Sequence, residues 1–403
     1  MDKVITSARK GIGGTVILPA SKSVSNRALV LSALAGGGLP ENLSDSDDTR
    51  VLVDALVRTG GLVDVGHAGT AMRFLAAYFA LRGGEWELTG SERMWQRPIK
   101  VLVESLRQLG ADIEYMAEEG FPPLRIGSAV LKGGKEINPD ASVSSQYISA
   151  LMMIAPLLEG GLVINLRGKV VSADYIYMTA EMMSRFGVNV DFKENRIVVS
   201  QGKYSPTVFR VDADWSAASF FFEVLAIAGE GEIFLPDLKF DSLQGDVRQI
   251  ALWQQLGVCA ESVAGGVRLW VNDERVPFFE ADMSGMPDVT LALVVACCLA
   301  DIPFRLRGIE TLYIKECDRV MAVMKELGKL GYKLYVPVHG ELCWNRERNT
   351  LISLNIDTYE DHRMAMAFAP AGLKFPGLTI KDAQVITKSF PDFWEQLDKL
   401  LDL

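Results

Sequence analysis

The sequence predicts an α/β fold with two domains, and three observations support this. The chain has 403 residues and is 49% hydrophobic, which is enough for two domains that each bury a core. Apolar residues recur at helical spacing in long segments that alternate with short β-type segments. Four of the helical segments end at a glycine followed by a strand pattern, roughly every 70 to 77 residues.

The helical spacing of apolar residues gives the predicted helices in chain order. They cover residues 23–35, 70–81, 98–109, 145–158, 173–186, 216–228, 245–256, 289–300, 317–330, 361–371 and 391–400. Short β-type segments lie between several of them and predict strands. These segments are VILP at 16–19, RIVVS at 196–200, TVFRVDA at 207–213 and FRLRGI at 304–309.

The glycines that follow the helices indicate an internal repeat, since glycine past a helix end is the usual left-handed cap. They are Gly110, Gly187, Gly257 and Gly331. An earlier candidate, Gly60, lies only about 50 residues before the first of them. The spacing predicts five or six related units of about 70 residues, with one shortened unit near residues 50–66. Coincidence is the alternative interpretation, because helix–glycine–strand junctions are common.

The charge and cysteine content exclude several classes of protein. The formal net charge is −10, which disfavours nucleic-acid binding but allows a locally positive pocket for a small anion. The five cysteines form no C-x-x-C pair, which favours reduced thiols in a cytosolic protein. The first residues lack the apolar core of a signal peptide, and the longest apolar run is too short to span a bilayer.

The segment SKSVSNR places a lysine and several hydroxyls where a strand leads into a helix. Ser21 and Ser23 are favourable N-cap residues, which is the structural interpretation. Helix N-termini also bind anions, and Lys22 and Arg27 would strengthen such a site. This segment alone does not decide between the two interpretations.

The same format recurs along the chain, with a cation or hydroxyls at helix starts. Examples are HAGT around Gly69, the serines of SVSSQYISA, and VVSADYI. Asp288 precedes a very apolar helix, either as an N-cap or as a carboxylate tuned for base catalysis. If these helix starts converge, they form an anion-binding site. The cations are Lys22, Arg27, Arg97, Lys315, Arg319, Arg363 and Lys388. The sequence shows no metal cluster, no dinucleotide-binding glycine pattern and no Ser/His/Asp signature.

Ten short blocks, in order, resemble the 5-enolpyruvylshikimate-3-phosphate (EPSP) synthase family. They are SKSVSNRAL, DSDDTR, AGTAMR, RPI, SVSSQY, QGD, PD, IKECDR, YEDHRMAM and KSFPDFW. The resemblance extends over residues 18–394 and implies transfer of the enolpyruvyl group of phosphoenolpyruvate to the 5-hydroxyl of shikimate 3-phosphate. This is a step of aromatic amino-acid biosynthesis, in the pathway that leads through chorismate.

The resemblance also implies the architecture and the partners. It implies an inside-out α/β barrel in each of two domains, built of βαβαββ units whose helix N-termini face an interdomain cleft. The expected domains are 1–19 with 214–403, and 20–213. No cofactor or metal is implied. The expected partners are the two small substrates alone, without nucleic acid or membrane, for a cytoplasmic monomer.

Residue roles are implied by matching positions. The expected catalytic residues are Asp288, Glu316 and Lys22. The expected shikimate 3-phosphate residues are Lys22, Ser23, Arg27, Ser144, Ser145, Gln146, Ser172, Tyr175, Asp288, Thr311 and Lys315. The expected phosphoenolpyruvate residues are Lys22, Gly69, Thr70, Arg97, Gln146, Arg319, Arg363 and Lys388.

Three positions depart from the family pattern. His67 and Phe74 stand where the family commonly has Asn and Pro, beside the phosphoenolpyruvate residues, which leaves the response to the inhibitor glyphosate open. Thr311 stands where many members have Asn. One alternative is the related UDP-N-acetylglucosamine carboxyvinyltransferase, which needs a loop cysteine, whereas the first cysteine here is Cys259. A catalytically silent anion-binding protein is the other.

Overall fold

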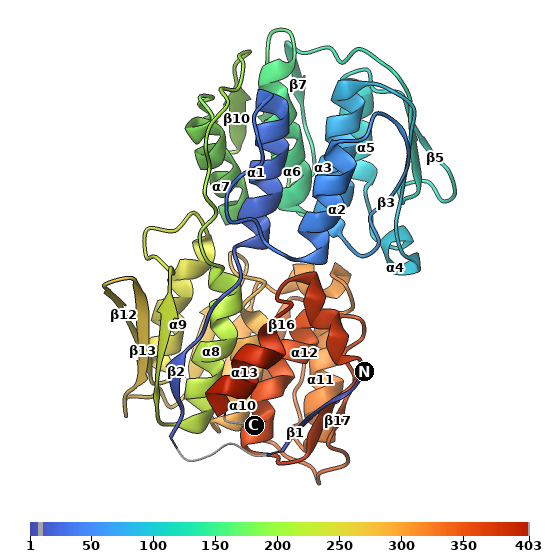
Figure 1. Ribbon diagram of the computed structural model, residues 1–403. Helices are drawn as coiled ribbons and strands as arrows, with labels where there is room; N and C mark the ends of the chain where they lie inside the picture. The colour runs from blue at the N-terminus through green and yellow to red at the C-terminus, as the bar shows by residue number, and fades with distance from the viewer. Residues whose placement is uncertain (7–10, 402–403) are drawn as a thin grey trace. The chain divides into compact units, whose positions relative to one another are not determined.

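The computed structural model describes residues 1–6 and 11–401 and divides into two compact units. Unit 1 comprises Met1–Ser21 and Asp212–Leu403, and unit 2 comprises Lys22–Val211. Each unit contains helices and small sheets, drawn in Figure 1 with the labels used below. The polypeptide therefore begins in unit 1, forms all of unit 2 and then returns to unit 1.

Unit 2 contains two sheets with the same topology. Its elements are α1 (Lys22–Ala35), α2 (Asp47–Leu56), β3 (Gly61–Asp64), α3 (Gly69–Arg82), β4 (Trp86–Thr89), α4 (Glu92–Trp95), α5 (Lys100–Gln108), β5 (Ile113–Tyr115), β6 (Leu124–Ile126), β7 (Lys135–Ile137), α6 (Ser145–Ile154), β8 (Leu162–Asn165), α7 (Ala173–Arg185), β9 (Asp191–Lys193) and β10 (Arg196–Val199). The sheet orders are β3-β4-β6-β5 and β7-β8-β10-β9. In each, a parallel pair flanks a helix and an antiparallel hairpin follows, so both are βαβαββ units.

Unit 1 contains three further sheets. Its elements are β1 (Lys3–Ile5), β2 (Gly13–Thr15), α8 (Trp215–Ala228), β11 (Glu232–Pro236), η2 (Gly245–Arg248), α9 (Gln249–Gln255), β12 (Val258–Val263), β13 (Gly266–Val271), β14 (Phe279–Asp282), α10 (Thr290–Leu299), β15 (Phe304–Arg307), η3 (Glu310–Ile314), α11 (Arg319–Lys329), β16 (Glu341–Trp344), β17 (Asn355–Ile356), α12 (His362–Phe368), η4 (Ala369–Leu373), β18 (Leu378–Ile380), η5 (Ala383–Lys388) and α13 (Phe393–Leu401). The orders are β12-β13-β11-β2, β14-β15-β16 and β1-β18-β17. The N-terminal strands β1 and β2 each complete a sheet made mainly from the C-terminal half of the chain.

Each unit has apolar helices at its centre. In unit 1, helices α8, α10 and α12 contact one another and are buried along almost their whole lengths. In unit 2, helices α1, α3 and α6 do the same. A helix that is hydrophobic on all sides is stable only when it is surrounded by other elements. The more amphipathic helices and the open sheets therefore lie around the central ones, and no sheet closes on itself in the described residues.

The structure confirms the predicted helices, with differences at their ends. The segment predicted at 145–158 divides into α6 and the 3₁₀ helix η1 (Ala155–Leu157), and the segment at 361–371 divides into α12 and η4. Both divisions fall at a proline, Pro156 or Pro370, which lacks the N–H needed to continue an α-helix. The polar helix α2 was not predicted, although Ser46 caps it by accepting a hydrogen bond from the backbone N–H of Thr49.

Two of the quoted strand segments are confirmed and two are wrong. RIVVS and FRLRGI contain β10 and β15. The segment 207–213 forms only isolated bridges, because its partners Ala20 and Glu41 lie in loops. The segment 16–19 lies beyond the end of β2 at Thr15, although the backbone N–H of Val16 still donates to the carbonyl of Phe234.

The predicted glycine caps are confirmed by their backbone angles. Gly110, Gly187, Gly257 and Gly331 have φ of 101°, 87°, 83° and 92°. These angles fall in the left-handed region that favours glycine. At the earlier candidate, Gly60, the left-handed residue is instead its neighbour Gly61, with φ of 91°. Helix α2 ends at Leu56 and only four residues separate it from β3, which begins at Gly61.

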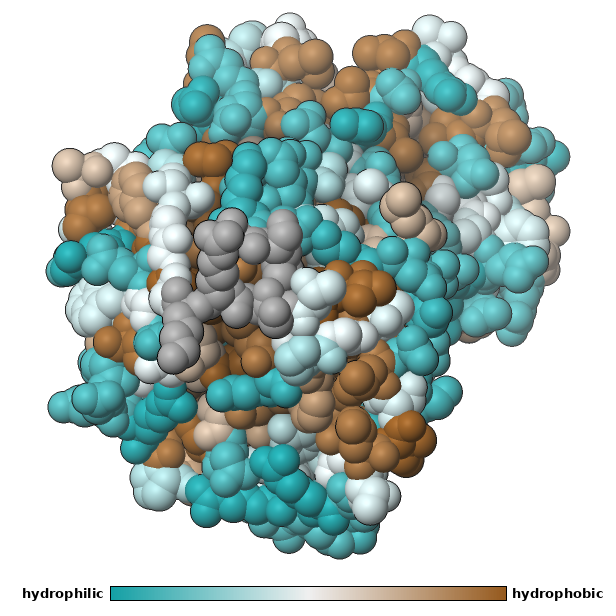
Figure 2. All heavy atoms as spheres, turned by 60° about the horizontal axis from the view of Figure 1, so that its bottom comes forward, coloured by the Kyte–Doolittle hydropathy of each residue, from teal (hydrophilic) through white to brown (hydrophobic). Residues whose placement is uncertain are grey.

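None of the helices in the described part of the chain combines the length and the apolar character that crossing a bilayer requires. Figure 2 shows a face of unit 1 on which hydrophilic and hydrophobic residues are interspersed.

The stacked pair Phe79 and Trp86 provides a test of the unit 2 core. Their rings are nearly parallel, with centroids 3.8 Å apart, and both side chains are buried. Replacing Phe79 with Ala is expected to destabilise unit 2 by about 3–5 kcal/mol, through lost burial and a cavity. Urea denaturation followed by circular dichroism measures this loss. The control Leu62→Ala removes a side chain that is 56% exposed and should have little effect.

Candidate functional site

The N-terminal turns of the unit 2 helices lie close together. The side chain of Gln146, in the first turn of α6, donates to Thr70 Oγ1 in the first turn of α3 at 3.0 Å. Tyr147 OH donates to the carbonyl of Pro98, which precedes α5. Ser144 caps α6 through the backbone N–H of Gln146. The expected residues Gln146, Thr70, Ser144 and Ser145 therefore belong to one cluster of helix starts, where free N–H groups favour anions.

Arg27 is a buried cation of this cluster and has only neutral partners. Its Nε donates to Thr179 Oγ1 at 2.7 Å, and its Nη2 donates to Ser149 Oγ at 3.2 Å and to the Tyr175 carbonyl at 3.4 Å. Its Nη1 donates to the carbonyl of Ser23. Burial lowers the pKa of Arg27 to about 10, so the guanidinium remains charged at neutral pH. A buried charge without a carboxylate partner favours binding of an anion.

Lys22 begins α1 and lies 3.6 Å from a carboxylate that the sequence analysis did not select. That carboxylate is Asp48 of α2, and both side chains are largely buried. Asp48 belongs to the block DSDDTR and lies two residues after Ser46. Its place in the first turn after that N-cap residue could have suggested a role for it. The pairing places the ammonium of Lys22 beside the first turn of a second helix.

Gly69 and Arg97 are in such close contact that a side chain on Gly69 would require the guanidinium of Arg97 to move. A Cβ atom on Gly69 would lie 2.6 Å from Arg97 Nη1 and 2.9 Å from its Cζ. The guanidinium of Arg97 is mostly buried, and its Nε has no hydrogen-bond partner. Arg73, which the sequence analysis did not select, donates to the carbonyls of Gly69 and Pro98 at 3.2 and 3.0 Å. It therefore fixes the two backbone segments that bring Gly69 and Arg97 together.

Ser172 and Tyr175 lie at the start of α7. Ser172 has φ of 52°, a left-handed conformation that is unfavourable for a residue with a Cβ, and its side chain does not cap the helix. The Tyr175 ring lies 5.5 Å from the Arg27 guanidinium. Helix α7 therefore begins at a residue in an unfavourable backbone conformation and without a side-chain cap from Ser172.

The expected residues of unit 1 form an alternating network of charges around Arg319. Arg319 is buried and bonds Asp361 twice, from Nε at 2.7 Å and from Nη2 at 3.1 Å. Its Nη2 also donates to Glu316 at 3.0 Å, and its Nη1 lies 3.4 Å from Asp288. Burial alone would lower the pKa of Arg319, but the three carboxylates raise it well above its ordinary value.

The other two cations of the network share these carboxylates. Arg363 Nη1 donates to the Asp288 carbonyl at 2.8 Å, and its Nη2 lies 3.1 Å from the Asp288 carboxylate. Lys388 Nζ lies 2.7 Å from Glu316. Thus Asp288 contacts Arg319 and Arg363, and Glu316 contacts Arg319 and Lys388. Each carboxylate is partly exposed, while these cations are nearly buried. Guanidinium and ammonium groups are therefore in direct contact with carboxylates here.

Lys315 directly precedes Glu316 of this network in the chain, and Thr311 comes four residues before Lys315. Thr311 lies in η3 and Lys315 follows it, both partly buried. No hydrogen bond joins Thr311 to the network in residues 1–6 and 11–401. Cys317 Sγ lies 3.6 Å from Asp361, and burial raises the pKa of the Cys317 thiol, with Asp361 adding to the effect, so the thiol is protonated at neutral pH.

Asp246 is a further carboxyl group beside this network that the sequence analysis missed. It is buried in η2 and accepts a hydrogen bond from Ser216 Oγ. Burial raises the pKa of Asp246 to about 7, and the charge of Asp288 adds to the effect. The block QGD contains Asp246, but no periodicity or spacing distinguishes it from a surface turn residue.

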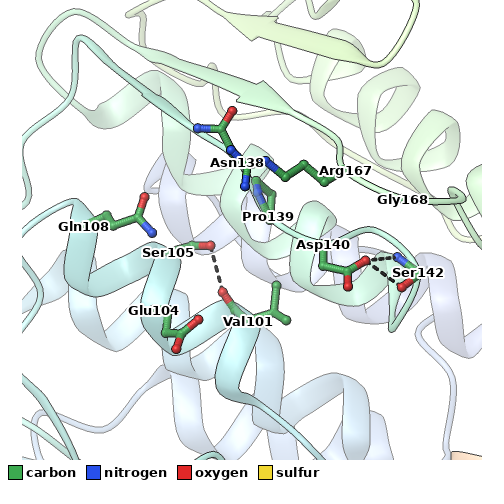
Figure 3. A pocket seen from close by; sticks show the side chains of 10 residues that line it. All are labelled: Val101, Glu104, Ser105, Gln108, Asn138, Pro139, Asp140, Ser142, Arg167 and Gly168. Atoms are coloured by element: carbon green, nitrogen blue, oxygen red, sulfur yellow. Dashed lines mark hydrogen bonds between the residues drawn. The ribbon is translucent and has the colours of Figure 1, made fainter.

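Two pockets lie away from the expected residues. One of about 400 Å³ in unit 2 is lined by α5, by residues 138–142 and by Arg167 and Gly168 (Figure 3). Its loops lead to Ser144 and Ser172, but no residue expected from the sequence lines it. A second, of about 520 Å³, lies between α11 and Tyr359. No group of His, Cys, Asp and Glu suited to a metal occurs in the described residues.

The raised pKa of Asp246 predicts a pH-dependent stability. Because the folded pKa of about 7 exceeds the ordinary 3.8, the folded state holds this proton more tightly than the unfolded state. This contribution is present at acidic pH and is lost as the pH rises from about 4 to about 7. The side chain of Asp246→Asn cannot lose a proton. The melting temperature of this variant relative to that of the wild type should therefore increase as the pH rises over this range. A constant difference between the two across pH would contradict the assignment.

Comparison with known proteins identifies the family. A family model described as EPSP synthase (3-phosphoshikimate 1-carboxyvinyltransferase) matches residues 58–397. A Bacteroides fragilis protein named 3-phosphoshikimate 1-carboxyvinyltransferase is 45% identical over 400 residues, which cover 98% of this chain and 97% of that protein. A protein of the same name from Vibrio vulnificus is 37% identical over 435 residues and matches over 100% of both chains.

A solved structure shows the same fold. The EPSP synthase structure from Acinetobacter baumannii superimposes with a TM-score of 0.79 at 23% identity, covering 99% of this chain and 98% of that one. The predicted α/β enolpyruvyl transferase fold is thereby confirmed. The sequence relatives, the family model and the shared fold agree, and the chain belongs to the EPSP synthase (3-phosphoshikimate 1-carboxyvinyltransferase) family.

Proposed function

We propose that this protein transfers the enolpyruvyl group of phosphoenolpyruvate to the 5-hydroxyl of shikimate 3-phosphate, releasing inorganic phosphate. The observation that carries the proposal is the network of unit 1, in which Arg319 contacts Asp288 and Glu316 directly. The reaction joins multiply anionic molecules and moves protons at the same centre, so it needs cations and carboxylates side by side. Family membership supplies the identity of the two substrates.

Unit 2 supplies the residues for shikimate 3-phosphate. Ser144, Ser145 and Ser172 offer hydroxyls and helix N-termini to the phosphate, while Gln146 and Tyr175 lie beside the ring. Arg27, a buried cation with neutral partners, holds the carboxylate together with Ser23. From unit 1, Thr311, Lys315 and Asp288 complete the set.

Several cations make up the proposed set of phosphoenolpyruvate residues. Arg97, packed on Gly69 beside Thr70, contributes an unpaired guanidinium Nε. Arg319, Arg363 and Lys388 contribute charges that are held in place by carboxylates. Fixed, desolvated cations bind phosphate and carboxylate groups strongly and require little reorganisation during the reaction. Lys22 contacts both substrates.

Three residues transfer protons. Asp288 accepts the proton of the 5-hydroxyl as the oxygen adds to C2 of phosphoenolpyruvate. Glu316, with Lys22, delivers a proton to C3 and takes one back as phosphate leaves the tetrahedral intermediate. The cations that contact Asp288 and Glu316 exchange them for substrate anions, because both carboxylates are partly exposed at the edge of the network.

The proposal includes no cofactor or metal. The proposal places the protein in the cytoplasm as a monomer, in the pathway to chorismate and the aromatic amino acids. It has the two small substrates as its partners.

Phosphate release from phosphoenolpyruvate and shikimate 3-phosphate tests the proposal, with Asp288→Asn beside the wild type. The wild type should release phosphate, and the variant should turn over about 10²–10⁴-fold more slowly, as expected when a general base is removed. Release only with UDP-N-acetylglucosamine would overturn the substrate assignment, and release with neither acceptor would indicate a silent protein. Equal turnover of wild type and variant would remove Asp288 from the base role.

Gly69→Ala tests the contact between Gly69 and Arg97. The new methyl group would lie 2.6 Å from Arg97 Nη1, so the guanidinium must move. The KM for phosphoenolpyruvate is expected to rise by about tenfold or more, since a bidentate charge-assisted contact is worth roughly 1.5–3 kcal/mol. The KM for shikimate 3-phosphate should change much less. An unchanged KM for phosphoenolpyruvate would show that Arg97 does not bind it.

A further inference from the structure

Asp361 is the most deeply buried carboxylate of the unit 1 network. Its side chain is fully buried, whereas those of Glu316 and Asp288 remain 13% and 17% exposed. A buried carboxylate is costly unless its oxygens are fully bonded. Both oxygens of Asp361 are bonded, and the partners include Arg319 and Arg363, which are expected to bind phosphoenolpyruvate, together with the Cys317 thiol.

The contacts of Asp361 fix two arginines at once. Its two oxygens accept from Nε and Nη2 of Arg319, which holds one edge of the guanidinium in a two-point contact. Oδ1 also accepts from the backbone N–H of Arg363 at 2.9 Å and caps α12. The same carboxylate therefore orients one arginine side chain and determines where the helix carrying the other begins.

The loop that delivers Asp361 is held in an unfavourable backbone conformation. Tyr359 and Glu360 both have left-handed φ angles, of 53° and 56°, directly before it. Glu326, a buried carboxylate of α11, anchors this loop through Tyr359 OH at 2.5 Å and the backbone N–H of Asp357 at 3.0 Å. Consecutive strained residues are retained only where the surrounding contacts specify them, and here they place Asp361 against Arg319.

We infer that Asp361 is a positioning residue: it fixes Arg319 and Arg363 in the geometry that binds the phosphate and carboxylate of phosphoenolpyruvate. It does not touch the substrate, because its own oxygens are buried against the two arginines. Glu316 and Asp288 exchange partners during the reaction, whereas Asp361 stays paired. The inference rests on the proposed function for the identity of the anion.

Two variants separate the pairing of Arg319 from the capping of α12. Asp361→Ser retains a good N-cap and removes the carboxylate from Arg319, whereas Asp361→Asn keeps the shape and removes the charge. Both should raise the KM for phosphoenolpyruvate by about tenfold or more and leave the KM for shikimate 3-phosphate within about twofold. The affinity for inorganic phosphate, measured by calorimetry, should fall in parallel.

The matched control is Glu223→Gln, which alters another buried carboxyl group of unit 1, on α8, whose oxygens have no hydrogen-bond partner in the described residues. It should leave both KM values and the phosphate affinity unchanged. A wild-type KM and phosphate affinity in Asp361→Ser would show that Asp361 only caps the helix and would overturn the inference. If the wild-type protein released no phosphate from the two substrates, the proposed function would fail. The positioning role would still be supported if Asp361→Ser lost affinity for inorganic phosphate while the wild type and the control variant kept it.

Discussion

The burial of apolar helices at the centre of each unit determines where the polar chemistry of this protein lies. Helices such as α3 and α10 are apolar on every side, so their flanks cannot reach solvent. Only their ends remain for polar groups, and the ends that gather the cations and hydroxyls are the N-terminal ones. The contact between Gln146 and Thr70 in unit 2, and that between Arg363 and Asp288 in unit 1, both follow from this packing.

The two units use this arrangement with different electrostatics. In unit 2, Arg27 is buried and donates to neutral oxygens, and Arg97 has a buried Nε without a hydrogen-bond partner in the described residues. Both arginines therefore favour the binding of an anion. In unit 1, Arg319, Arg363 and Lys388 alternate with carboxylates. The first arrangement suits tight binding of a phosphorylated substrate. The second suits a reaction in which substrate anions and carboxylates exchange partners while protons move.

Burial of charged groups has a free-energy cost, and the structure meets it in different ways. Arg319 is stabilised by three carboxylates. Asp246 remains partly protonated near neutral pH and bonds Ser216. Glu223, inside α8, is fully buried and neither of its oxygens has a hydrogen-bond partner, so burial raises its pKa well above the ordinary value. A neutral carboxyl group is the form with the lower cost in an apolar core.

The sequence by itself determined the α/β class, most of the helices and the glycine caps. Each of these depends on local spacing or on one residue's backbone freedom, as at Gly110 and Gly187. Ordered blocks such as IKECDR and YEDHRMAM carried the resemblance to the family and pointed to Arg319, Arg363 and Glu316. Helix α2 was not predicted, although it is amphipathic. The alternating pattern of 207–213 predicted a strand, but the segment forms only isolated bridges because its partners Ala20 and Glu41 lie in loops.

Only the tertiary structure decided which residues act as partners. Asp361 and Arg319 are 42 positions apart, and Asp48 and Lys22 belong to different helices, so no spacing rule could pair them. The tertiary structure also decided that Arg27 is buried and that Gly69 contacts Arg97. Burial and pairing depend on how the helices pack, and that packing is the sum of many apolar contacts between residues distant in the chain.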